Sequence, residues 1–308
     1  MDRAGGEASR TERRTCELIV CAKGEKQIPR LRHAHPRFAR KSARDFARDD
    51  RISRTMSAKP NDAVIRPMSS ELRFQNRVAL IAGGTGALGR AVSAAFASEG
   101  ARVVVTYRRQ SEFDDFLSES KLSPQDVKGA VVDATDAAGV ARMIESIVAG
   151  GGALDILVNT IGGYHGGKRI WEEDPSSYEQ MMSLNLKAGF VLARAVIPAM
   201  IRQNRGWVVN VASRAAYGKS PGAALYSASK AGALALFDSL AEEVKSYPIS
   251  VNSVVPSIFD TPANRRAMPG ADYANWPKPE EIADVILFLC SPQARIIHGA
   301  AIPVYGRT

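Results

Sequence analysis

The sequence predicts an α/β protein built on a doubly wound parallel sheet of about seven strands, with helices on both faces. From residue 77 onward, short apolar segments alternate with stretches of helical character, and a glycine-rich turn follows the first apolar segment. The apolar segments are continuous rather than alternating, as expected for strands that are covered on both faces. Strands that alternate with helices form right-handed βαβ units, which build such a sheet.

The predicted strands are rich in β-branched and other apolar residues. They cover residues 78–82, 102–106, 129–132, 156–159, 207–212, 250–255 and 300–304. Helices are predicted between them, over residues 87–99, 111–119, 136–148, 176–203, 225–246 and 279–290. Neither an internal repeat nor a second change of composition follows residue 77, so residues 71–308 are predicted to form one domain.

The first 70 residues differ from the rest in charge. They hold 17 Lys and Arg against 9 Asp and Glu, a net charge of +8, whereas residues 71–308 hold 24 and 23, a net charge of +1. The segment lacks sustained apolar periodicity, so we expect a disordered basic extension over residues 1–70. Two alternatives stay open: sequence translated from too early a start, with Met56 and Met68 as candidate starts, or a basic arm for nucleic acid or membrane surfaces.

Composition limits the function class further. The chain of 308 residues is 45% apolar and has three cysteines, Cys16, Cys21 and Cys290, with no CxxC pair. Neither a disulfide framework nor a zinc site is expected, and because His165 and His298 have no partner at metal-ligand spacing, no metal is predicted. Uninterrupted apolar runs stay below the roughly 18–20 residues that span a bilayer. We therefore expect a soluble, cytoplasmic protein with neither membrane nor nucleic acid among its partners.

A glycine-rich segment joins the first predicted strand to the first predicted helix, with the sequence Gly83-Gly84-Thr85-Gly86-Ala87-Leu88-Gly89. Glycines at such a turn let backbone N–H groups approach a pyrophosphate at the positive end of the helix. The sequence therefore predicts a dinucleotide site whose contacts include Gly83, Thr85, Gly86, Leu88 and Gly89. The spacing is Gly-x-x-x-Gly-x-Gly with Ala87 in the middle glycine place, which is looser than GxGxxG.

The end of the second predicted strand indicates which dinucleotide binds. An acid about 20 residues beyond the glycines would hydrogen-bond the ribose 2′-hydroxyl of NAD. The chain has Tyr107, Arg108 and Arg109 there instead, with no acid until Glu112. Because guanidinium groups can bind a 2′-phosphate in bidentate fashion, NADP(H) is the predicted cofactor and NAD(H) the alternative. Arg108 and Arg109 are the predicted contacts, unless both are solvated loop charges.

Two Tyr-x-x-x-Lys pairs occur in the chain. Tyr226 and Lys230 fall in the predicted helix 225–246, where side chains four residues apart lie on one side. Tyr164 and Lys168 fall in a Gly-Gly-Tyr-His-Gly-Gly-Lys segment, where the same spacing fixes no common face. We therefore take Tyr226 and Lys230 as the functional pair and the other pair as a coincidence.

Two more polar residues reinforce this choice. Ser213 lies thirteen residues before Tyr226 and just past the predicted strand 207–212. It is thus at the carboxyl edge of the sheet, where ligands bind in open α/β folds. Asn185 lies in the preceding predicted helix. These four residues resemble the catalytic tetrad of the short-chain dehydrogenase/reductase family in order and spacing: Asn185, Ser213, Tyr226 and Lys230. The spacing of the glycines in residues 83–89 resembles that family too.

This resemblance covers residues 77–305, and it implies a Rossmann fold and an NAD(P)-dependent oxidoreductase.

Hydride transfer to a carbonyl builds negative charge on its oxygen, which needs a proton donor at neutral pH. A free tyrosine titrates near about 10, and two unit charges about 4 Å apart interact by up to about 4 kcal/mol at an effective dielectric near 20. A cationic Lys230, helped by the oxidised nicotinamide, is therefore expected to lower the pKa of Tyr226, the expected acid and base. Ser213 would polarise the carbonyl oxygen.

The resemblance implies further contacts. Lys230 would hold the hydroxyls of the nicotinamide ribose, and Asn185 would hold a water in a proton relay. The remaining cofactor contacts would be Asp133 to the adenine, Asn159 along the adenosine ribose, the backbone of Phe259 to the carboxamide, and Thr261 to the phosphates. Ser257 stands where the family usually has glycine. Family members are usually homodimers or homotetramers built on the helices equivalent to 176–203 and 225–246.

The predicted reaction is NADP(H)-dependent reduction of a small-molecule carbonyl to an alcohol, or the reverse. Residues 260–276 resemble the matching segment of dihydropteridine reductases, a branch that lacks the serine. The presence of Ser213 favours ordinary carbonyl reduction, as in the 3-oxoacyl-carrier-protein reductases. Dihydropteridine-reductase-like activity and a non-catalytic NADP-sensing role are the alternatives. Candidate lining residues of an apolar substrate cleft are Tyr164, Trp171, Tyr217, Phe259 and Trp276, and each could equally be a packing residue.

Overall fold

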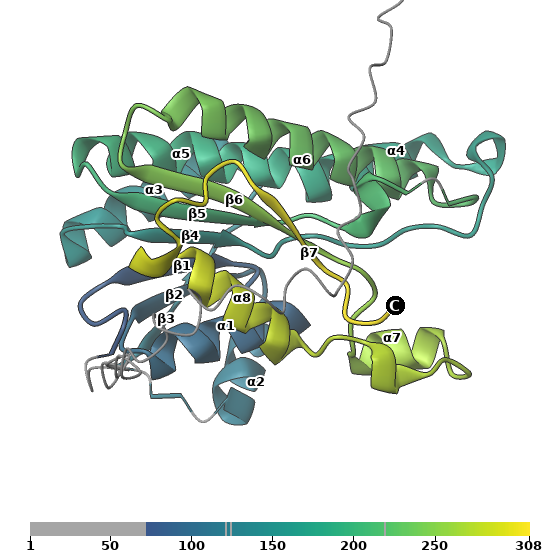
Figure 1. The fold of residues 1–308 in the computed structure, drawn as a ribbon, viewed down its shortest axis with the longest axis horizontal. Coiled ribbons are helices and arrows are strands. Elements are labelled where there is room, and N and C mark those ends of the chain that lie inside the picture. Colours follow the sequence, from purple (N-terminus) through teal and green to yellow (C-terminus); the bar gives the residue numbers. More distant parts are fainter. Residues whose placement is uncertain (1–71, 121, 124, 219) are drawn as a thin grey trace, which may run out of the picture. The chain divides into compact units, whose positions relative to one another are not determined.

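The computed structural model describes residues 72–308 apart from residues 121, 124 and 219. The extension predicted over residues 1–70 lies outside the described residues, as do Cys16, Cys21 and the two candidate starts. The described residues form a seven-stranded sheet in the order β3-β2-β1-β4-β5-β6-β7, with every pairing parallel. The predicted doubly wound sheet is thereby confirmed (Figure 1).

The strands lie close to their predicted positions. They are β1 Val78–Ala82, β2 Arg102–Tyr107, β3 Val127–Val131, β4 Ile156–Asn159, β5 Gly206–Val211, β6 Ile249–Pro256 and β7 Ala301–Val304. The largest difference at a strand start is in β3, which begins two residues before the predicted one. This edge strand pairs with β2 alone, and its exposed Lys128 interrupts the apolar pattern on which the prediction depends.

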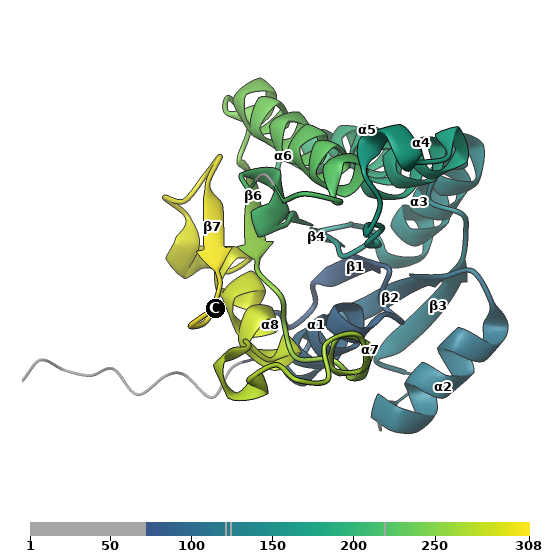
Figure 2. The ribbon, with the colours of Figure 1, turned by 90° about the vertical axis from the view of Figure 1, so that its right-hand side faces the viewer.

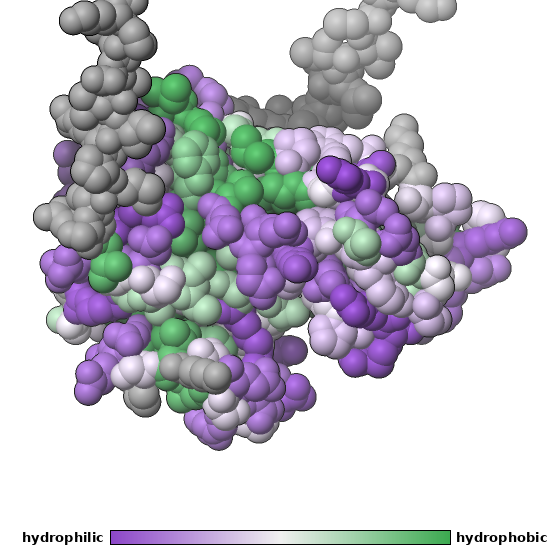
Figure 3. All heavy atoms as spheres, turned by 60° about the horizontal axis from the view of Figure 1, so that its bottom comes forward, coloured by the Kyte–Doolittle hydropathy of each residue, from purple (hydrophilic) through white to green (hydrophobic). Residues whose placement is uncertain are grey.

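Helices cover both faces of the sheet (Figure 2). On one face lie α1 Ala87–Ser98, α2 Gln110–Ser120 and α8 Pro279–Leu289; on the other lie α3 Ala137–Gly151, α4 Pro175–Met182, α5 Ala188–Arg202 and α6 Ala224–Val244. Phe96, Phe116 and Ile286 belong to the core under the first group, and Leu192 and Phe237 to the core under the second. The outer side of the first group is mainly hydrophilic, with hydrophobic residues between (Figure 3).

One predicted helix, over residues 176–203, is interrupted in the structure. A π-helical turn, Ser183–Lys187, joins α4 to α5. Such turns are rare and occur often at functional sites, and this one contains Asn185. Within the described residues, the run Pro175–Arg202 is long and apolar enough to cross a bilayer, but 56% of its most apolar window is buried in the protein. It packs here as a core helix beside α3 and α6.

A buried carboxylate ties together the amino ends of three strands. Asp155, just before β4, is fully buried, and its Oδ2 accepts a hydrogen bond from the Val78 N–H at 2.9 Å. Its Oδ1 pairs with Arg77 at 3.1 Å and with Arg205 at 2.5 Å. Since these partners flank or begin β1 and β5, the carboxylate fixes both neighbours of β4.

The opposite end of β4 has a polar anchor of its own. Asn159 is buried, and its Nδ2 donates to Oδ1 of Asn210 on β5 at 3.0 Å. Its Oδ1 accepts from the Ile161 N–H at 3.3 Å. The apolar residues Ile156 to Val158 of β4 therefore lie between two buried, hydrogen-bonded side chains, and the second of these, Asn159, lies at the carboxyl edge of the sheet.

Candidate active site

The glycine-rich turn brings β1 and α1 into close contact at the carboxyl edge of the sheet. Gly83 has φ +78°, a conformation that favours glycine. A Cβ atom at Gly89 would overlap the carbonyl oxygen of Gly83, so only glycine lets the helix approach the turn this closely. Gly86 caps α1 without a side-chain hydrogen bond, and the first turn of the helix has no acidic residue. The positive end of α1 is therefore available to an anion, which fits the pyrophosphate of a dinucleotide.

A cleft of about 670 Å³ opens at this turn. Of the predicted cofactor contacts, five line it: Gly83, Thr85, Gly86, Arg108 and Asp133. Lining residues that were not predicted as cofactor contacts include Arg90, Thr106, Tyr107 and Thr135. Glycines, hydroxyls and a guanidinium are donors suited to phosphate and ribose oxygens, so the cleft fits the adenosine and pyrophosphate half of NAD(P).

The two predicted arginines lie in different surroundings. Arg108 lines the cleft, and its charge helps to hold the pKa of Asp133 below its usual value, behind the larger effect of hydrogen bonds from Thr135. Arg109 instead forms an ion pair with Glu112 at 2.6 Å, one turn into α2, and does not line the cleft. Of these two guanidinium groups, only that of Arg108 therefore lies in the lining of the cofactor cleft.

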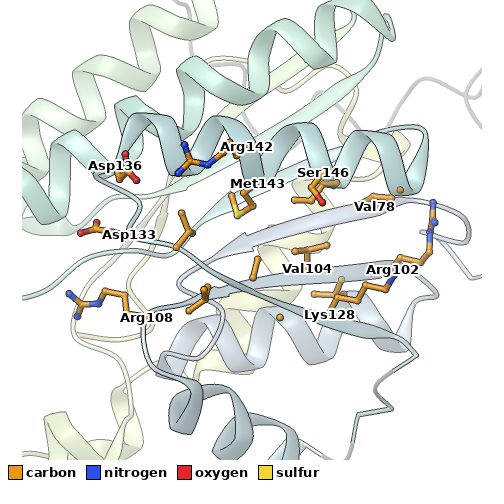
Figure 4. A pocket seen from close by; sticks show the side chains of 18 of the residues that line it. Val78, Arg102, Val104, Arg108, Lys128, Asp133, Asp136, Arg142, Met143 and Ser146 are labelled. Atoms are coloured by element: carbon orange, nitrogen blue, oxygen red, sulfur yellow. The ribbon is translucent and has the colours of Figure 1, made fainter.

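A second, larger cleft of about 950 Å³ adjoins the first and lies between β2, β3 and α3 (Figure 4). The two clefts share Arg108, Val132 and Asp133. Arg108 and Asp133 lie at one end of this cleft, while Arg102 and Lys128 lie toward the other end, at the starts of β2 and β3. None of the predicted catalytic residues lines either cleft, so cleft volume alone does not identify the site of chemistry here.

Besides Arg109, Tyr226 and Lys230, five predicted cofactor contacts lie outside the cleft lining; they are Leu88, Gly89, Asn159, Phe259 and Thr261. The Leu88 side chain packs into the core, which leaves only its backbone for a ligand. The side chain of Thr261 caps a short helix, α7 Pro262–Ala267, and the carbonyl of Phe259 accepts from Asn264. Their roles toward the cofactor stay predictions.

The predicted catalytic residues gather where β5 and α6 meet. Ser213 follows β5 and begins the 3-10 turn Arg214–Ala216, and its Oγ accepts from the Ala215 N–H at 3.2 Å. Tyr226 and Lys230 stand one turn apart on α6, and Tyr226 shares a hydrogen bond with Ser213. Lys230 is buried, and its Nζ donates to the carbonyl of Val211 at 3.1 Å.

Asn185 and Lys230 meet on either side of one glycine. A Cβ atom at Gly162 would lie 2.7 Å from Lys230 Nζ and 3.0 Å from Asn185 Oδ1. Asn185 Oδ1 accepts from the Gly163 N–H at 2.9 Å, and its Nδ2 donates to Ser229 Oγ at 2.9 Å and to the Gly163 carbonyl at 3.0 Å. Asn185 and Lys230 thus meet beside Gly162, which lines the cofactor cleft, and the hydrogen-bonded pair of Tyr226 and Ser213 lies one turn of α6 away from Lys230.

Burial dominates the acid–base properties of this group. It lowers the pKa of Lys230 to about 8. It raises the pKa of Tyr226, against the hydrogen bond with Ser213, and the Tyr164 hydroxyl adds to the rise. The protein's own groups therefore keep Tyr226 protonated at neutral pH, as a proton donor to a carbonyl oxygen requires. Lys230, which was expected to lower the pKa of Tyr226, does not contribute to this shift.

Tyr164, predicted to match Lys168 only by coincidence and named as a candidate lining residue of the substrate cleft, contacts the side chain of Tyr226. Its ring packs edge-on against the Tyr226 ring, with centroids 5.0 Å apart and an interplanar angle of 71°. Spacing alone cannot reveal this contact, because a glycine-rich loop crosses to α6 only in the folded protein. The other candidate aromatics differ: Trp171 is 73% exposed, and Trp276 is buried against Tyr273.

The segment after β6 is held together by contacts between its own side chains. No helix was predicted within residues 260–276, where the structure has α7. Arg265 makes two hydrogen bonds of 2.6 Å to Asp260 and stacks on the Tyr273 ring at 4.8 Å. At its start, Ser257 donates to the carbonyl of Tyr305 at 3.0 Å. The serine in the usual glycine place is therefore used to join this turn to the segment after β7.

A parallel sheet of this order, a dinucleotide cleft at its carboxyl edge and a Ser, Tyr and Lys group beside that cleft together define a nicotinamide-dependent oxidoreductase. Comparison with known proteins agrees. The family model for short chain dehydrogenases matches residues 77–271. The chain belongs to the short-chain dehydrogenase/reductase family, whose members bind NAD(P).

Individual relatives share about a third of their residues with this chain. It is 32% identical over 245 residues to the 3-oxoacyl-[acyl-carrier-protein] reductase FabG of Thermotoga maritima, covering 76% of this chain and 98% of that protein. It is 31% identical to the 7alpha-hydroxysteroid dehydrogenase of Bacteroides fragilis, covering 76% and 95%. Among solved structures, a short-chain dehydrogenase/reductase of Burkholderia xenovorans has a TM-score of 0.71 at 31% identity, covering 76% and 96%.

Proposed function

We propose that the protein is an NADP(H)-dependent oxidoreductase that reduces a carbonyl to an alcohol, or catalyses the reverse, in the manner of the 3-oxoacyl-carrier-protein reductases. The observation that carries this proposal is the meeting of Ser213, Tyr226, Lys230 and Asn185 beside the cofactor cleft. The similarity to the Thermotoga maritima reductase supports the class of acceptor. Arg108 in the cleft, with no acid on β2, supports NADP(H) over NAD(H).

Each residue contributes a definite part of the chemistry. When bound, the nicotinamide donates or accepts the hydride. The protonated Tyr226 hydroxyl gives its proton to the carbonyl oxygen, and Ser213, hydrogen-bonded to it, holds that oxygen in place. Lys230 binds the ribose hydroxyls and, when charged, favours the tyrosinate left behind. Asn185 fixes the Gly163 backbone next to Lys230, where a relay water would pass the replacement proton.

The test is cofactor oxidation by the full chain, with NADPH and NADH assayed separately. The acceptors are 3-oxoacyl thioesters, simple ketones, quinones and a quinonoid dihydropterin. We expect turnover with NADPH that falls by at least about 100-fold in Tyr226→Phe, since a positioned proton donor contributes about 10²–10⁴-fold. Tyr247→Phe, in the turn that follows α6, is the matched control and is expected to keep full activity.

The outcomes separate the proposal from its alternatives. Turnover confined to the dihydropterin would replace it with a dihydropteridine-reductase-like activity. Tight NADPH binding without turnover of any acceptor would favour a sensing role. Activity that survives in Tyr226→Phe would contradict the assignment of the proton donor.

A further inference from the structure

Tyr164 makes a contact with the catalytic tyrosine that the proposed chemistry does not use. Its ring stands edge-on to the half-buried Tyr226 ring at a centroid distance of 5.0 Å, yet Tyr164 itself remains 70% exposed. An aromatic side chain that supports the proton donor on one side and leaves most of its surface uncovered is suited to contact a third group.

The loop that carries Tyr164 is tied down on both sides of this residue. The Gly163 N–H donates to Asn185 Oδ1 at 2.9 Å, and the Gly167 N–H donates to the Gly222 carbonyl at 2.8 Å. Between them, His165 Nε2 contacts the buried Glu173 carboxylate at 2.8 Å. The ring of Tyr164 is therefore held in one place against α6, although its side chain is exposed.

The glycine at 166 is required by the position of Tyr164. A Cβ atom there would collide with the Tyr164 hydroxyl and would lie 2.8 Å from the Gly222 carbonyl. The backbone of Gly166 has no positive φ, so alanine is opposed there by these close contacts and not by backbone conformation. Gly166 thus offers a way to displace the Tyr164 side chain without altering it.

We propose that Tyr164 is a specificity-determining residue: it holds the Tyr226 ring in place and forms the wall on which a flat, unsaturated ring attached to the substrate carbonyl packs. This inference rests on the proposed carbonyl reduction. A carbonyl within hydrogen-bond reach of the Tyr226 hydroxyl places its substituent beside the Tyr226 ring, and therefore against Tyr164. A flat ring can stack on Tyr164, whereas a linear chain touches it along one edge only.

The test compares acetophenone with 2-octanone, an aryl and a linear methyl ketone of eight carbons each, using the full chain and NADPH. Tyr164→Ala is expected to lower kcat/KM for acetophenone about twofold to tenfold more than for 2-octanone, the range for one aromatic pair. Tyr164→Phe keeps the ring and is expected to preserve this ratio. Gly166→Ala is expected to change the ratio as Tyr164→Ala does. Tyr247→Ala, in an aromatic residue remote from the site, leaves it unchanged.

A second readout reports on Tyr226 itself. The Tyr164 hydroxyl raises the pKa of Tyr226, so Tyr164→Phe should move the Tyr226 step in the pH profile of kcat/KM to lower pH. A residue with only a structural role would not move that step. Binding of NADPH by each variant shows that it is folded.

Three results would overturn the inference while leaving the reaction intact. The first is that the wild type reduces linear but not aryl ketones. The second is that the ratio of kcat/KM for acetophenone to that for 2-octanone is unchanged in both Tyr164→Ala and Gly166→Ala. The third is that Tyr164→Phe leaves the Tyr226 step of the pH profile where it is in the wild type. If the wild type reduces no acceptor at all, the proposed function fails instead, and Tyr226→Phe identifies that case because it then changes nothing.

Discussion

Lys230 shows how a single buried charge sets limits on both chemistry and stability. Its side chain lies in the interior, where Nζ finds one carbonyl, that of Val211, and burial lowers its pKa to about 8 from an ordinary 10.5. Near neutral pH the ammonium is retained at the cost of desolvation, and the proton is lost more readily than from a lysine in water. The residue is therefore both a positive charge for Tyr226 and a source of instability.

This gives a pH dependence with a definite sign. Between pH 8 and 10.5 the unfolded chain keeps the Lys230 proton and the folded protein has lost it, so stability from this group rises with pH. Relative to Lys230→Met, the wild type should gain on the order of 2 kcal/mol between pH 7 and 9.5. Urea unfolding of both proteins at the two pH values measures it. If the stability of the wild type does not rise relative to that of Lys230→Met, the lysine keeps its proton in the folded state over this pH range.

Arg108 and Arg109 are adjacent in sequence but differ in their surroundings, so the alanine variants of the two residues can be compared as test and control. Arg108→Ala should weaken NADPH binding by about tenfold to a hundredfold, the contribution of a charge-assisted hydrogen bond, and leave NADH binding nearly unchanged. Arg109→Ala should have little effect, because that side chain is paired with Glu112. Titration of both cofactors against each variant measures this, and equal losses for the two variants would contradict the assignment.

At the scale of the element, β4 depends on the carboxylate that precedes it. Asp155→Ala would leave the Val78 N–H without its acceptor and two arginines without their anion, in a place where Asp155 is fully buried. We expect a loss of about 3 kcal/mol, as for breaking a buried ion pair from one side. Thermal or urea unfolding measures the loss. Glu242→Ala, which breaks an exposed pair with Lys245, is the control and should cost well under about 1 kcal/mol.

The elements that could be predicted from sequence are those whose pattern is local. Continuous apolar strands and the glycines after β1 depend on near neighbours, and both were placed within a few residues. The π turn at Asn185 and the contact of Tyr164 could not be predicted. Both depend on a loop, residues 162–167, that is held by α6 and by the chain around Gly222. The ion pair between Arg109 and Glu112 likewise could not be predicted, because it depends on where α2 begins.

At the scale of the whole molecule, the outer side of α5 leaves a large apolar residue uncovered. Phe190 is 49% exposed on this helix, the one expected to pair with a second copy of the chain. We propose a homodimer or homotetramer built on α5 and α6. Phe190→Asp should then lower the mass measured by light scattering to that of a smaller assembly. Ile170→Asp, equally apolar and 64% exposed in another segment, should leave the mass unchanged.

The two polar ends of β4 also bear on how the chain finds its fold. Its interior residues, Ile156 to Val158, are all apolar and fully buried, so apolar contacts alone would accept this strand shifted along its neighbours. Any such shift carries Asp155 away from the Val78 N–H and Asn159 away from Asn210, and each would then be buried without its partner. The paired ends therefore act as a check on strand alignment during folding. A misaligned sheet is therefore less stable than the native one by the cost of burying these polar groups without partners.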